Sequence, residues 1–122
     1  MLPSHLGIEV VELEPGHSRL RLDIAKHHMA LNGYLHAGTV ITLADTTCGY
    51  GALASLPDGA VGFTTIETKS NHLGTAVSGG VVAEGIMRHS GRTTQVWDAT
   101  VTAEESGKAI ALFRCTQLVL WQ

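Results

Sequence analysis

The sequence predicts an α+β fold in which an antiparallel sheet of about six strands wraps round one long central helix. The helix is indicated by a run from residue 39 to residue 56 that contains no proline and is apolar on nearly all sides, as buried helices are. The sheet is indicated by six stretches that are rich in β-branched residues or alternate apolar and polar side chains. A chain of 122 residues has room for one modest core, so residues 1–122 are expected to form a single domain.

Two strands are expected in the N-terminal part of the chain. Residues 7–13 carry enough β-branched side chains for the first strand, and the turn signal Pro15-Gly16 follows it. Residues 18–24 alternate apolar and charged side chains, so the second strand should place one face on the core. Residues 25–36 are irregular and contain the turn signal Asn32-Gly33.

The long helix is expected over residues 39–56, and Pro57-Asp58-Gly59 supplies a stop. Gly49 and Gly51 lie inside this helix, where each glycine costs about 1 kcal/mol relative to alanine. We expect this cost to be offset by the close approach of a sheet or a ligand.

Four more strands should follow the helix. Short turns separate the last three, so neighbouring strands are expected to form antiparallel hairpins. The expected strands are residues 61–71, 80–89, 93–103 and 108–121.

The composition argues against several classes of protein. The formal net charge is −3 and no basic stripe is present, so a nucleic-acid partner is not expected. Cys48 and Cys115 lie far apart in the chain, which favours two buried thiols in a reducing cytoplasm. No signal peptide and no apolar run of about 18 residues is present, so we expect no membrane partner and a cytoplasmic location. Charged residues make up only 16%, which favours an oligomer that hides part of the surface.

The loop that enters the helix is the first candidate for chemistry. Residues 32–38, with sequence NGYLHAG, are mostly small or turn-forming and lead into the helix. The first amides of a helix lack partners within the helix, and with the helix dipole they suit a developing oxyanion. The alternative is a plain glycine-rich loop before a helix.

Asp45 is the second candidate. It is the lone carboxylate on a mostly apolar helix, and burial of a charge costs several kcal/mol unless the group is paired or functional. Burial should also raise its pKa, which suits a general base. The alternative is a carboxylate that accepts a backbone hydrogen bond or faces a water pocket.

Distance along the helix separates these two candidates. Ala37 and Asp45 are eight residues apart, which is about 12 Å along a helix axis. A general base must lie about 3 Å from its proton, directly or through one water. If both features are catalytic, two antiparallel helices must share them, and the protein must be at least a dimer.

Residues 35–51, LHAGTVITLADTTCGYG, resemble the signature of the PaaI-type hotdog thioesterases. That signature is Gly-x-x-His-Gly-Gly followed by a helix with Asp or Glu eight residues after the first paired glycine. Gly33, His36, Gly38 and Asp45 match at this spacing. The later segment from residue 65 to residue 71, Gly80 and the pair Gly91-Arg92 also resemble the family's later strands, so the resemblance covers nearly the whole chain.

The resemblance implies a hotdog fold and hydrolysis of an acyl-coenzyme A thioester, with Asp45 as general base or nucleophile. The amide of Ala37, beside Gly38, would polarise the thioester carbonyl, His36 would help to place it, and Thr65 would orient the hydrolytic water. Coenzyme A would bind in a groove between the subunits of a homodimer or homotetramer. No metal and no cofactor other than the coenzyme A of the substrate is implied.

This sequence departs from the family pattern at two positions. Ala37 replaces the first paired glycine, which keeps the N–H and adds a methyl group near the thioester. The family's Asn six residues before the His is Ala30 here, and Asn32 is shifted by two positions.

The remaining candidates are weaker. Asn32 and Tyr34 are predicted to contact substrate, and a basic hairpin is predicted to hold coenzyme A phosphates unless it is only a solvated turn. The hairpin residues are Arg88, His89, Gly91 and Arg92. His27 and His28 lack a metal-ligand spacing, and Cys48 is expected in the core.

Two further functions stay open beside the thioesterase hypothesis. One is a non-catalytic acyl-CoA-binding sensor, which has no need of a buried carboxylate beside helix amides. The other is a hotdog dehydratase, which is expected to place its acid/base His differently. Fold analogy alone does not choose among them.

Overall fold

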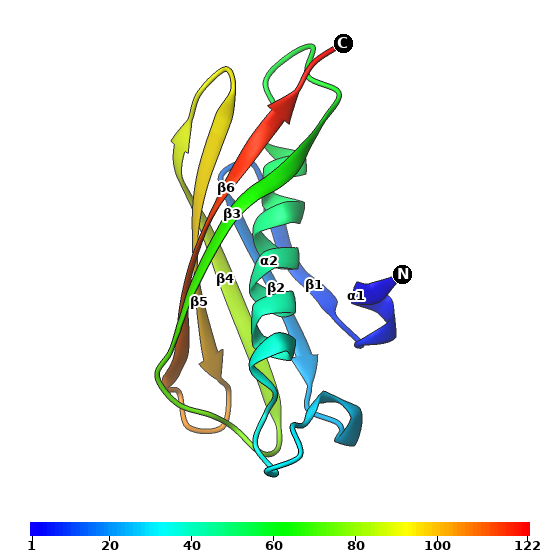
Figure 1. Ribbon diagram of the computed structural model, residues 1–122, viewed down its shortest axis with the longest axis vertical. Helices are drawn as coiled ribbons and strands as arrows, with labels where there is room; N and C mark the ends of the chain where they lie inside the picture. Colours follow the sequence, from blue (N-terminus) through cyan, green and yellow to red (C-terminus); the bar gives the residue numbers. More distant parts are fainter.

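The computed structural model describes all 122 residues and confirms a six-stranded antiparallel sheet curved round one long helix, the hotdog arrangement (Figure 1). The strand order is β1-β2-β4-β5-β6-β3, so β1 and β3 are the sheet edges. The strands are β1 (Glu9–Glu14), β2 (His17–Asp23), β3 (Gly62–His72), β4 (Gly80–Ser90), β5 (Thr94–Ala103) and β6 (Ala109–Leu120). The helices are α1 (Leu2–His5), a 3₁₀ turn at Lys26–His28, and α2 (Ala37–Ala54).

All six predicted strands are confirmed, and so is the long helix, which begins and ends two residues earlier than expected. The earlier start arises because the His36 side chain accepts a hydrogen bond from Gly38 N and caps the helix there. The short α1 was not predicted. Neither α-helix has the length and hydropathy needed to cross a lipid bilayer.

The core lies between α2 and the concave face of the sheet (Figure 1). In the inner strands β2, β4, β5 and β6, buried side chains at alternate positions face the helix, as the alternation in β2 predicts, whereas the edge strands β1 and β3 bury no residue. Fully buried members include Leu20, Leu22, Leu43, Cys48, Val81, Trp97, Val101 and Cys115. Both cysteines are free and buried, which agrees with the prediction that they fill the core.

Gly51 explains part of the unusual helix composition. An added Cβ at this position would lie 2.5 Å from the Trp97 ring, closer than real Cβ contacts allow. The prediction of a close approach is therefore confirmed for the sheet. At Gly49 the added Cβ would lie 3.3 Å from the Phe63 ring, so a second ring packs close to the helix backbone.

Candidate active site

Asp45 borders a small cavity on the side of α2 that faces strand β3. The cavity has a volume of about 250 Å³ and receives side chains from α1, α2 and β3. Its lining residues are Pro3, Asp45, Thr46, Gly49, Tyr50, Leu53, Phe63 and Thr65. Two sequence-predicted residues, Asp45 and Thr65, therefore meet in one cavity although they come from different elements.

Few interactions offset the cost of burying the Asp45 carboxylate. Its Oδ1 atom is buried and has no hydrogen-bond partner. Burial raises the pKa of Asp45 above its ordinary value, because desolvation penalises the charged form. A carboxylate with a raised pKa and a free buried oxygen is suited to take a proton from a bound water.

The start of α2 presents a second group of predicted residues. Gly38 N donates a hydrogen bond to His36 Nδ1 at 2.7 Å. The Gly38 amide is thus already occupied, whereas the Ala37 amide has no acceptor in the structure. Because Nδ1 of His36 accepts, a neutral His36 carries its proton on Nε2 and can donate from that atom. His36 and Ala37 are both exposed.

His28 fixes the loop that leads into α2. Its carbonyl oxygen accepts hydrogen bonds from His36 N at 3.0 Å and from Thr39 Oγ1 at 2.9 Å. Its ring Nδ1 accepts from Ala25 N at 2.9 Å, and its Nε2 lies 2.7 Å from the carbonyl oxygen of Leu6. Both ring nitrogens are occupied by backbone groups, so His28 acts here as a structural residue.

Asn32 and Tyr34 lie at the exposed tip of this loop. The Asn32 side-chain oxygen accepts a hydrogen bond from Tyr34 N at 3.2 Å, which closes a local turn. Gly33 has φ +83°, a conformation that favours glycine. Neither side chain borders the Asp45 cavity, so their contact with substrate stays a prediction.

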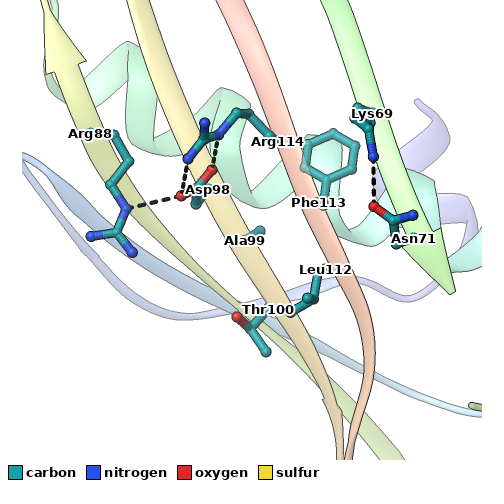
Figure 2. A pocket seen from close by; sticks show the side chains of 9 residues that line it. All are labelled: Lys69, Asn71, Arg88, Asp98, Ala99, Thr100, Leu112, Phe113 and Arg114. Carbon is teal, nitrogen blue, oxygen red and sulfur yellow. Dashed lines mark hydrogen bonds and ion pairs between the residues drawn. The ribbon is translucent and has the colours of Figure 1, made fainter. Parts of the chain in front are cut away.

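The predicted hairpin cluster divides between two environments. Arg88 lies on the outer face of the sheet, where its Nε donates to Asp98 at 3.0 Å beside Arg114, as Figure 2 shows. Arg92 instead stacks on Trp121, with its guanidinium carbon 4.6 Å from the ring centroid. His89 packs over Gly91, where an added Cβ would lie 2.9 Å from its ring. Within one chain, Arg88 and Arg92 therefore do not form one cluster.

The predicted residues thus form three separate groups within one chain: the Asp45 cavity, the start of α2, and the β4–β5 hairpin. In Figure 1 the hairpin and the loop that enters α2 lie at opposite ends of the molecule.

Several residues of the cavity are not predicted from the sequence. Tyr50, Leu53 and Phe63 line it but carry only apolar or aromatic signals in the sequence. Gln117 is not predicted either, and its side-chain oxygen accepts a hydrogen bond from Thr65 Oγ1 at 2.7 Å. Gln117 is fully buried. An amide at an inward position of an otherwise apolar alternating strand is the signal that could have revealed it.

Comparison with known proteins identifies the family. A family model described as the thioesterase superfamily matches residues 32–110. The 1,4-dihydroxy-2-naphthoyl-CoA hydrolase of Listeria monocytogenes is 33% identical over 115 residues, which cover 94% of this chain and 92% of that protein.

Two solved structures are similar over most of the chain. A Haemophilus influenzae thioesterase superposes with a TM-score of 0.90 and 28% identity, covering 98% of this chain and 82% of that one. The Streptococcus mutans protein smu.793, in a structure bound to acetyl CoA, has a TM-score of 0.85 and 25% identity, with coverages of 94% and 90%.

Proposed function

Because this chain belongs to the thioesterase superfamily and is a thioester hydrolase, we propose that its substrate is an acyl-coenzyme A thioester, cleaved to the free acid and coenzyme A. The observation that carries this proposal is the buried, unpartnered Oδ1 atom of the half-buried Asp45, in a cavity that also contains Thr65. The substrate class is supported by the similarity to a CoA-thioester hydrolase and to a protein bound to acetyl CoA.

In the proposed reaction Asp45 acts on a water held between its carboxylate and Thr65. Asp45 takes one proton as the water oxygen bonds to the thioester carbonyl carbon, and the carbonyl oxygen becomes an oxyanion. Collapse of this intermediate breaks the C–S bond, and the proton passes from Asp45 to the departing thiolate. Direct attack by Asp45 is the alternative role of the same carboxylate. Neither route requires a metal or a cofactor other than the coenzyme A of the substrate.

The oxyanion would be stabilised by the amide end of a second subunit. The Ala37 amide is free but lies eight residues from Asp45 on one helix, about 12 Å along the axis. His36 Nε2 can donate beside it. An antiparallel pair of α2 helices would bring each Ala37 amide to the other chain's Asp45.

Strand β3 supports such a homodimer. It is an edge strand that spans Gly62–His72, and Ile66 on it is 56% exposed. A long exposed edge is a template for pairing with another strand. Pairing of β3 with β3 of a second copy would continue the sheet, and a homotetramer would join two such dimers.

The apolar wall beside Asp45 supports an uncharged, apolar acyl group. Tyr50 and Leu53 line the Asp45 cavity and also a neighbouring depression of about 330 Å³. The other residues of that depression are Val10, Leu13 and Ala54, all apolar. Burial of apolar acyl surface there would contribute about 25 cal/mol per Å².

The test is hydrolysis of acetyl-, hexanoyl-, palmitoyl- and benzoyl-CoA, followed with a thiol-reactive dye. Asp45→Asn should keep the fold and lower kcat by about 10²- to 10⁴-fold, the range expected for loss of a general base. Circular dichroism of both proteins provides the folding control. A folded variant with near wild-type kcat would exclude the catalytic role of Asp45. A wild-type protein that binds these thioesters without cleaving them would favour the sensor.

A further inference from the structure

The geometry points to Gln117 on β6 as a positioning residue that sets the direction of the Thr65 hydrogen bond, so that Thr65 can only accept from the hydrolytic water. This inference rests on the proposed function and adds a residue to it. It follows from three observations: the strand register, the hydrogen bond between the two side chains, and the contrast with a second buried glutamine.

The register places Gln117 directly beside Thr65. The two residues are cross-strand partners in the β3–β6 pair. A bulge follows at once, because Thr65 pairs with Gln117 and Glu67 with Thr116, which leaves Ile66 as the extra residue. Bulges change the direction of side chains, and this bulge lies next to Thr65, which lines one cavity with Asp45. Thr65 therefore lines the cavity as an exposed residue of β3, while its partner Gln117 on β6 is fully buried.

The hydrogen bond fixes where the Thr65 proton lies. Thr65 Oγ1 donates to Gln117 Oε1 at 2.7 Å. A hydroxyl has one proton and two lone pairs, so Thr65 has only acceptor capacity left for the cavity. A water that donates one proton to Thr65 and the other to Asp45 keeps both lone pairs free, and one of them can attack the carbonyl carbon. With the Thr65 proton directed at the water, one of the two lone pairs would be occupied and only one water proton would be held by Asp45, so the water would be a weaker and less well oriented nucleophile.

The neighbouring Gln95 shows what a purely structural glutamine does. It is also fully buried and pairs with Gln117 across β5 and β6. Its Oε1 accepts from Trp97 Nε1 at 2.8 Å, and its Nε2 donates to the Ser55 carbonyl oxygen at 3.1 Å. Gln117 Nε2, in contrast, reaches only Cys115 Sγ at 3.4 Å. The strong bond of Gln117 is the one to Thr65.

A double-mutant cycle tests the proposal in the intact protein. Gln117→Met removes the acceptor at similar volume, and Thr65→Val removes the hydroxyl at similar shape; Gln117→Leu serves as a second variant if Met packs poorly. We expect Gln117→Met to lower kcat about 10- to 100-fold with little change in KM. In the Thr65→Val background the same substitution should leave kcat unchanged within about twofold, because the two residues act as one unit. The matched control, Gln95→Met, should lower the urea midpoint while kcat stays near wild type.

Each outcome decides the proposal. An equal loss of kcat from Gln117→Met with and without the Thr65 hydroxyl would overturn it, as would a loss no larger than that of Gln95→Met. In that case hydrolysis that still depends on Asp45 shows that the proposed function survives. Absence of hydrolysis in the wild-type protein overturns both.

Discussion

At the scale of single residues, the carboxylates of this chain fall into two kinds. Asp98 accepts hydrogen bonds from Arg114 and Arg88, and these partners hold its pKa below the ordinary value. Asp45 has no such partner, and burial raises its pKa. The first arrangement stabilises the folded chain at neutral pH, whereas the second opposes it. A carboxylate that lowers the stability of the folded chain in this way is expected where it takes part in a reaction.

This contrast predicts opposite effects of two Asp→Asn substitutions on stability. The pKa of Asp45 is higher in the folded chain than in the unfolded chain, where it is about 3.9. Its contribution to folding stability is therefore fully present below that unfolded-state pKa, and it is lost as the pH rises through the folded-state pKa. Asp45→Asn should therefore raise the melting temperature at pH 7 and flatten its decline above pH 4. Asp98 has the reverse linkage, so Asp98→Asn should lower the melting temperature at pH 7. Thermal melts of the three proteins from pH 3 to pH 8 check both signs, and a lower melting temperature for Asp45→Asn at pH 7 contradicts the assignment.

A single residue can be singled out from the sequence where it contradicts its local pattern. Asp45 stands out because it is charged on an apolar helix, and in the structure it is half-buried with its Oδ1 atom fully enclosed. Thr65 is predicted only by the family resemblance, and it lies in the same cavity. The inward amide of Gln117 could have been noticed in the sequence, but its link to Thr65 could not, because the two residues are 52 positions apart and only the strand register brings them together.

At the scale of elements, the helix was predicted well because its proline-free run is apolar on nearly all sides, and the inner strands because each buries one face against the same core. The β4–β5 hairpin shows the limit. The sequence grouped Arg88 with Arg92, but alternation places Arg88 on the outer sheet face, and the turn directs Arg92 to Trp121. Side-chain direction at a hairpin depends on a strand register that spacing alone does not reveal. The bulge between Met87 and His89 adds to this divergence.

The hairpin geometry predicts that Arg92 matters more to coenzyme A than Arg88 does. Stacking on Trp121 leaves the N–H edge of Arg92 available to a phosphate, whereas Asp98 already offsets the charge of Arg88. Arg92→Ala should raise KM for acyl-CoA about tenfold with little change in kcat, as loss of a charge-assisted hydrogen bond would.

Steady-state kinetics at two salt concentrations measure this effect, since the salt dependence of KM should also weaken. Arg114→Ala, on the outer face with Arg88, is the matched control. Unchanged KM in Arg92→Ala would mean that the hairpin is only a solvated turn.

At the scale of the whole molecule, one chain holds all parts of the proposed site but keeps them apart. The free Ala37 amide lies at one end of α2, Asp45 lies more than two turns along it, and the hairpin lies at the opposite end of the molecule (Figure 1). An antiparallel dimer would bring parts of different chains together. The proposed active site is therefore a property of the assembly.

Mixing of two inactive variants tests the shared site. Ala37→Pro removes the free amide, and the fold should tolerate it because Pro suits the first helical position and His36 already has ψ 132°. Neither Ala37→Pro nor Asp45→Asn should be active alone, but their mixed dimer contains one intact site. Hydrolysis should return on subunit exchange, with Ala37→Ser as the control that keeps the amide. If mixed dimers form, shown by native mass spectrometry, and stay inactive, each site lies within one chain.

The separation of Ala37 from Asp45 along one helix also has a genetic consequence. In the proposed shared-site dimer, a chain that carries both Ala37→Pro and Asp45→Asn would damage both sites, because it would contribute to each. Such an allele would be dominant over the wild type. With equal expression of the two chains and random pairing, only about one quarter of the dimers would be pure wild type and retain activity.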